Sequence, residues 1–162
     1  MSDMPSIRPK LIITLAMVLF VFTLSTKGQS ITVNNDLTFG DIFPGIPKAV
    51  AKTTPGSAAE FYVSGTAGAE VSIDFTLPTY MNYSGFNMQL IFKDTDCALD
   101  SSAAPDQTDP GSDNLDPWHT ITYRLGSNGL IIWLGGTAVP KLNQREGGYS
   151  ALIVITVAYT GN

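Results

Sequence analysis

The chain has 162 residues, of which 44% are hydrophobic and 14% charged, and its formal net charge is −5 at pH 7. This acidic balance, without a cluster of Lys or Arg, would repel nucleic acids and anionic membrane surfaces, so we expect neither as a partner. The single cysteine excludes an intrachain disulfide, so packing alone must hold the fold together.

The N-terminal segment has the layout of a secretory signal peptide. Arg8 and Lys10 precede an apolar run at 11–24, which is followed by the small and polar stretch 25–28. A helix that spans a bilayer needs about 20 apolar residues. The run is shorter than that, so cleavage is favoured over a permanent membrane anchor.

We therefore expect residues 1–28 to be removed, with Gln29 as the favoured new N-terminus and Ser25 or Ser30 as competing sites. Removal would change the formal net charge from −5 to −7. Residues 29–162 are then predicted to form one domain without membrane insertion. The expected location is the periplasm, the cell surface or the extracellular medium.

Beyond this segment, apolar and β-branched residues occur in short runs separated by Gly, Pro, Asn and Asp, and none shows helical spacing. This pattern is typical of β-strands joined by turns. In chain order, strands are predicted at 31–39, 47–53, 59–64, 70–77, 87–93, 119–125, 129–135 and 149–160. Eight strands at this spacing favour an antiparallel sandwich or a barrel.

Two local patterns predict how some of these strands are placed. Ser127-Asn128-Gly129 is a strong hairpin signal, so strands 119–125 and 129–135 are predicted to pair directly. The last strand, 149–160, is apolar on both faces. It is expected to lie centrally in the fold, or else to present one face to a partner.

The segment 94–116 differs from the rest because it holds seven aspartates and few hydrophobic residues. It is predicted to be a long, exposed acidic loop that folding does not require. A calcium site built on Asp94 and Asp96, or on a cluster of Asp106, Asp109 and Asp113, is an alternative, since calcium prefers oxygen ligands. The EF-hand register fails, however, and the solvated loop is favoured.

The only histidine, His119, and the only cysteine, Cys97, invite a comparison with a base and a nucleophile. No third orienting group and no Gly-x-Ser-x-Gly motif accompanies them, and a zinc site of Cys and His residues is excluded by their number. We therefore assign no catalytic, cofactor-binding or metal-binding residue and predict that the protein is not an enzyme. Cys97 is expected to be buried and inert, with an intermolecular link as the alternative.

Three aromatic residues around the turn 82–85, namely Tyr80, Tyr83 and Phe86, do not fit one face of a strand. Core packing is the favoured explanation for them. The alternative is an exposed patch that stacks on sugar rings or on a partner protein.

Four segments together resemble a bacterial family called domain of unknown function 4402, and more distantly spore coat protein U and fimbrial subunit domains. They are Asp-Leu-Thr-Phe-Gly-Asp-Ile at 36–42, Ala-Glu-Phe-Tyr-Val-Ser-Gly at 59–65, Gly-Gly-Thr-Ala-Val at 135–139 and the ending 147–159. The resemblance implies an immunoglobulin-like β-sandwich that is exported to the envelope or beyond, with relatives in pili and coats. It carries over no catalytic residue.

The leading functional hypothesis is a non-catalytic structural or adhesin-like subunit of a pilus or coat, and the alternative is a carbohydrate-binding surface module. A hydrolase is a distant third. A structural subunit would associate with its own copies or with other surface subunits through strand edges. The edge beside strand 149–160 is expected to be filled by the N-terminal segment, 30–39, of the same chain, or in an assembly by that of another copy.

Overall fold

The structure, a computed structural model, describes residues 28–161, so nearly all of the predicted signal peptide lies outside the described residues. All regular elements of the described part are β-strands, which confirms the all-β prediction. None of the described residues belongs to a helix long and apolar enough to cross a membrane.

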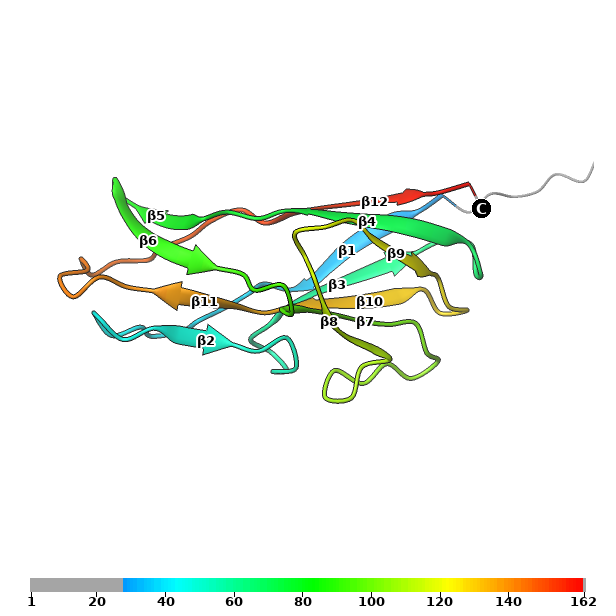
Figure 1. The fold of residues 1–162 in the computed structure, drawn as a ribbon, viewed down its shortest axis with the longest axis horizontal. Helices are drawn as coiled ribbons and strands as arrows, with labels where there is room; N and C mark the ends of the chain where they lie inside the picture. The colour runs from blue at the N-terminus through cyan, green and yellow to red at the C-terminus, as the bar shows by residue number, and fades with distance from the viewer. Residues whose placement is uncertain (1–27, 162) are drawn as a thin grey trace, which may run out of the picture.

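The strands form three antiparallel sheets. The first has the order β1 (Ser30–Asn35), β3 (Ala59–Ser64), β10 (Leu130–Leu134), β7 (Cys97–Asp100) and β8 (Ser112–Leu115). The second has the order β2 (Lys48–Val50), β11 (Gly136–Val139), β6 (Phe86–Ile91) and β5 (Tyr80–Tyr83), and the third β12 (Val154–Tyr159), β4 (Glu70–Thr76) and β9 (Ile121–Arg124). Many of the strands run along the long axis, and β1 begins at the end of the molecule where β12 finishes (Figure 1).

The first and third sheets pack against each other. In both strands, buried residues alternate with more exposed ones, so one face of each sheet enters the core. Phe61 of β3 and Phe75 of β4 meet in the core, with 6.2 Å between their ring centroids. The largest fully buried apolar side chains include Val63, Val71, Ile73, Leu99, Ile132 and Leu134. This arrangement is consistent with a β-sandwich.

Gly135 marks the point where the chain passes from β10 in the first sheet to β11 in the second. A Cβ atom there would lie 2.6 Å from the backbone N of Lys52 and from the backbone O of Val50. The backbone N–H of Gly135 also donates to the carbonyl of Asp96, at 2.8 Å. Only glycine allows the chain after β2 to approach this closely, and that approach positions Lys52.

The predicted pairing of strands 119–125 and 129–135 is wrong. The turn is present, but only an isolated bridge between Gly126 and Gly129 joins its two sides. Beyond the bridge, β9 pairs with β4 while β10 pairs with β3 and β7. Because β10 has buried residues on both faces, it fits the centre of the first sheet, whereas the half-buried β9 fits an edge.

The prediction of an exposed loop over 94–116 is wrong for Cys97–Asp100. These residues form β7, in which all four are buried, and β7 lies between β10 and β8. Aspartates dominate the composition of the whole segment, so a prediction from composition misses the short apolar run within it. Residues 101–109 remain mostly exposed, as predicted.

The last strand does not lie centrally. It begins at Val154 and forms an edge of the third sheet, paired only with β4 among the described strands. Ile155 and Val157 turn toward the core, but the opposite face is left open, with Val154 42% exposed. β10 and β7 occupy central positions of the first sheet, where a strand that is apolar on both faces would be buried. The alternative, that one face meets a partner, stays a prediction.

Candidate functional site

A long open groove runs between the N-terminal segment 33–44 and the segment 144–153, which we call the closing segment. Two adjoining cavities form it, of about 670 Å³ and about 360 Å³. Both are lined by Leu37, Phe39 and Met81, which join them into one surface. The groove therefore has an apolar floor, and Phe39 and Met81 in that floor are each 7% exposed.

The walls of the groove carry large apolar side chains that lie in solvent. Leu152 of the closing segment is 76% exposed, and Val33 and Phe43 of the N-terminal segment are 56% and 69% exposed. Clusters of exposed apolar residues around a groove mark interaction sites in soluble proteins. The groove is therefore the best-formed candidate for a binding surface on this domain.

Two strands near the groove have a single partner strand each among the described residues. β1 contributes Val33 and Asn35 to the lining of the groove, and the lining ends at Ile153, one residue before β12. On the described part of the chain, β1 pairs only with β3, and β12 pairs only with β4. Free N–H and C=O groups along such edges accept an added strand. The N-terminal segment therefore does not close the edge of β12, so the expectation that it does so within one chain is wrong for the described residues.

The aromatic residues singled out from the sequence hold the closing segment in place. Tyr83 packs on Tyr149, with 5.8 Å between ring centroids, and the guanidinium of Arg145 lies 4.7 Å from the centroid of the Phe86 ring. Both contacts join the β5–β6 hairpin, whose first strand the sequence analysis missed, to one wall of the groove. All three rings are nevertheless exposed, Tyr80 by 48%, Tyr83 by 37% and Phe86 by 43%, so the favoured explanation of core packing is wrong for them.

The structure does not bring His119 and Cys97 together. Cys97 is the first residue of β7 and is buried, as predicted. Burial raises the pKa of its thiol to about 12. His119 is exposed, and its Nδ1 atom lies 2.7 Å from Oδ2 of Asp116. Hydrogen bonds from the backbone N–H of Trp118 and from His119 lower the pKa of Asp116 below its ordinary value.

The aspartates considered for calcium bind donors of their own chain. Asp96 accepts from the backbone N–H of Lys93 at 2.8 Å, and Asp106 accepts from the backbone and side chain of Thr108 at 2.8 and 2.7 Å. Among residues 28–161, no group of three or more His, Cys, Asp or Glu is arranged to hold a metal ion. The calcium alternative therefore gains no support from the geometry.

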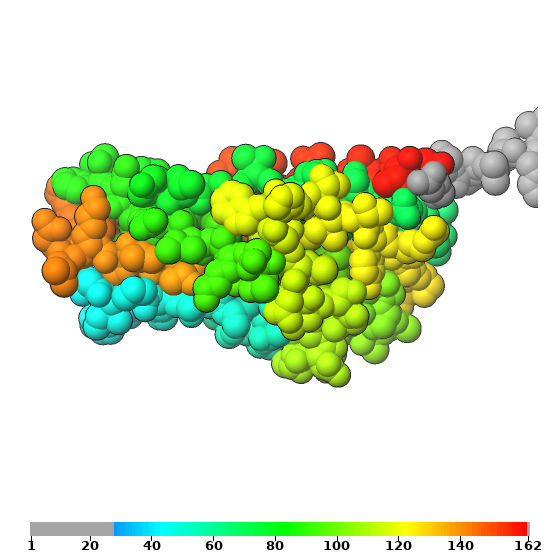
Figure 2. Space-filling model, in the orientation of Figure 1, coloured from blue at the N-terminus to red at the C-terminus, as the bar shows by residue number. Residues whose placement is uncertain are grey.

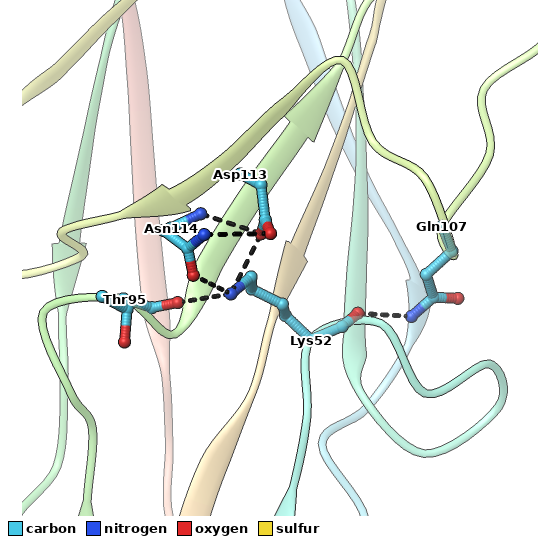
Figure 3. Close-up of polar contacts among 5 residues, drawn as sticks. All are labelled: Lys52, Thr95, Gln107, Asp113 and Asn114. Atoms are coloured by element: carbon cyan, nitrogen blue, oxygen red, sulfur yellow. Dashed lines mark hydrogen bonds and ion pairs between the residues drawn. The ribbon is translucent and has the colours of Figure 1, made fainter.

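One polar cluster was not anticipated from the sequence. Lys52 follows β2, and its ammonium group donates to Asp113 Oδ1 at 3.0 Å, to Asn114 Oδ1 at 3.0 Å and to the carbonyl of Thr95 at 2.6 Å (Figure 3). The backbone carbonyl of Lys52 accepts from the side chain of Gln107 at 2.7 Å. No sequence signal marks this lysine, because its three acceptors are distant in the chain.

A scan against protein-family models finds no match, and no curated protein is significantly similar to the chain. The resemblance to the bacterial family described above therefore stays a prediction. The argument for function rests on the geometry of the described residues.

Proposed function

We propose that the chain is an exported, non-catalytic structural or adhesin-like subunit of a surface pilus or coat, and that its sandwich is of the immunoglobulin-like type. The observation that carries this proposal is the apolar groove near strand edges that have no partner strand among the described residues. Exposed apolar side chains and open strand edges both promote the aggregation of an isolated domain. In a subunit that binds an added strand from its neighbour, both become part of the interface.

The occupant that fits the groove is an extended strand from another copy or from another surface subunit. Its main chain would hydrogen-bond to the free edge of β12, and alternate side chains would enter the apolar floor near Phe39 and Met81. The exposed Leu152 and Val154 then become buried in the assembly. Hydrophobic burial supplies the free energy of association, and the backbone supplies its register.

The test is to measure the assembly state of the secreted protein by light scattering and by electron microscopy of filaments. Val154→Lys places a charge on the open face of β12 and is expected to abolish assembly while leaving the monomer folded. Thr122→Lys is the matched control, since Thr122 is an exposed residue on β9 at the opposite edge of the same sheet. Equal assembly of both variants, or a wild-type protein that stays monomeric at all concentrations, would refute the proposal.

A second experiment asks whether β1 itself is exchanged between copies. The hydroxyl oxygens of Ser30 and Ser64 lie 2.7 Å apart across β1 and β3. The double variant Ser30→Cys, Ser64→Cys is therefore expected to form a disulfide, while the buried Cys97 stays out of the reaction. Disulfide-linked oligomers on a non-reducing gel would indicate exchange, and linked monomers that still assemble would indicate that β1 stays in place.

The carbohydrate-binding alternative depends on aromatic rings that remain open to solvent. Tyr80 and Phe86 are 48% and 43% exposed on the β5–β6 hairpin, so sugar rings have access to both. Binding to a glycan array that is lost in Tyr80→Ala, in a protein that remains monomeric, would favour this function over assembly.

A further inference from the structure

Lys52, Asp113 and Asn114 bring together an amine, a carboxylate and a carboxamide from two different sheets. Lys52 follows β2 in the second sheet, while Asp113 and Asn114 belong to β8, at the far edge of the first. The side chain of Lys52 is only 12% exposed. Figure 3 shows its amino group between the ends of the other two side chains.

The carboxylate of Asp113 bridges the other two groups. Its Oδ1 atom accepts from Lys52 Nζ at 3.0 Å, and its Oδ2 atom accepts from Asn114 Nδ2 at 3.1 Å. Lys52 Nζ also lies 3.0 Å from the amide oxygen of Asn114. One carboxylate thus contacts both a nucleophile and the leaving group of the amide beside it, as a proton relay requires.

We propose that Lys52 and Asn114 become joined by an intramolecular isopeptide bond. The amine of Lys52 first passes a proton to Asp113, and the lone pair of Nζ then attacks Cγ of Asn114. A bond forms between Nζ and Cγ, the bond between Cγ and Nδ2 breaks, and the nitrogen leaves as an ammonium ion. Asp113 carries two protons in turn from Nζ to the leaving Nδ2 and so returns to its starting carboxylate state. No oxidant or other reactant is consumed.

The same contacts set the speed of this reaction. Burial alone would raise the pKa of Asp113, but its hydrogen bond and attraction to Lys52, together with the backbone N–H of Asn114, lower it below the ordinary value. The resting state is therefore an ion pair between Lys52 and Asp113. The bond is expected to form slowly after folding, and faster at alkaline pH, because the attack requires Nζ to lose a proton.

The product would connect the end of β2 to β8 and so tie the second sheet to the far edge of the first. Such a link closes the chain between residues 52 and 114 and restricts the unfolded state, as a disulfide does. With one cysteine, the chain forms no disulfide within itself. A covalent tie at this place also resists pulling along the long axis, which suits a subunit of a filament.

The test is the mass of the secreted full chain, measured after purification and after several days at neutral and at alkaline pH. We expect a loss equal to one ammonia. Tryptic digestion should then yield fragment 49–93 joined to fragment 94–124 through Lys52 and Asn114, since no other Lys or Arg interrupts either fragment. An unchanged mass after the alkaline incubation would overturn the proposal.

Three variants separate this bond from other reactions. Lys52→Arg keeps the positive charge and must leave fragment 94–124 at its full mass, because a loss of ammonia from that fragment would indicate a cyclic imide of Asn114 alone. Asn114→Ala must likewise leave fragment 94–124 at its full mass and without a link to Lys52. Asp113→Ala keeps both reacting groups and is expected to form the bond at least tenfold more slowly, as loss of a proton relay costs about 10²–10⁴-fold. A loss of one water instead of ammonia in the wild type would assign the bond to Asp113 and refute the assignment to Asn114.

Discussion

The two sides of the molecule differ in how far their polar and apolar groups find partners within the same chain. At β7 and β8, which we call the pinned side, Lys52 donates hydrogen bonds to segments that are distant in the sequence, and Asp100 accepts hydrogen bonds from the turn that follows it. At the groove, apolar side chains such as Leu152 lie in solvent, and β1 and β12 each have one edge without a partner strand among the described residues. In Figure 2, residues around 100–125, coloured yellow-green to yellow, cover much of the right half of the face shown.

Both sides consist of short strands and irregular segments, so regular structure does not distinguish them. What differs is whether polar and apolar groups find partners within the same chain. Among residues 28–161, no buried side-chain nitrogen or oxygen lacks a hydrogen bond. Buried polar groups are therefore satisfied on both sides, and the groove is distinguished by apolar side chains that lie in solvent, such as Leu152 and Phe43.

The largest expected effect comes from the same substitution on the two sides. Leu99 in β7 is fully buried, so Leu99→Ala is expected to lower the free energy of unfolding by about 2–5 kcal/mol through lost contacts and a cavity. Leu152→Ala removes an exposed side chain and should change it by less than about 0.5 kcal/mol. Denaturant titration of the monomer measures both. Similar losses would mean that Leu152 is already buried in solution.

The buried carboxylate of Asp100 gives the next largest effect. It accepts hydrogen bonds from the backbone N–H groups of Ser102 and Asp106, at 2.7 and 3.1 Å. Asp100→Asn replaces one acceptor oxygen by a donor and is expected to lower the free energy of unfolding by about 1–3 kcal/mol. The exposed Asp109→Asn is the control, with a change under about 0.5 kcal/mol. Equal effects would show that the turn after β7 adds nothing to stability.

Acid should loosen the pinned side before the groove. Burial alone would raise the pKa of Asp100, but hydrogen bonds from Ser102, Asp106 and Gly111 lower it below the ordinary 3.8. A carboxyl with a lowered pKa stabilises the fold above about pH 4, and that contribution is lost as the pH falls toward its folded-state value. The protection factors of the Ser102 and Asp106 amides against hydrogen exchange should therefore fall below about pH 4. An Asp100→Asn protein with the same acid response would contradict this explanation.

Cys97 gives the smallest expected signal, which is no reaction at all. Its side chain is fully buried, and burial raises the pKa of the thiol to about 12, so little thiolate is available near neutral pH. A thiol reagent should label one group per chain in denaturant and almost none in the native protein. Native labelling at the rate of the denatured protein would show that β7 opens freely and that the pinned side is not closed.

Much of the fold follows from short-range patterns. Short runs of apolar and β-branched residues between turn residues predicted β3 and β4 nearly to the residue, at 59–64 and 70–77. The hairpin signal at Ser127-Asn128-Gly129 predicted the turn but not the partners of its strands. A turn directs the chain for one or two residues, while the burial of β10 on both faces decides its neighbours.

The candidate site was harder to predict, since it depends on distant pairings. The sequence marked 149–160 as apolar on both faces, yet its edge position follows from the strands that fill the sheets around it. Lys52 had no distinguishing neighbour in the sequence. Only the close approach at Gly135 and the position of β8 bring its amine to Asp113 and Asn114.

By itself, the sequence determined the all-β class, the positions of most strands and the absence of an intrachain disulfide, because these depend on periodicity, turn residues and the number of cysteines. The tertiary structure alone decided that the acidic segment contains a central strand, that β12 is an edge, and that Lys52 meets Asn114. Those outcomes depend on competition among strands for a limited number of buried positions. A strand becomes buried only where the neighbouring strands leave a position for it, and a local sequence pattern carries no information about those neighbours.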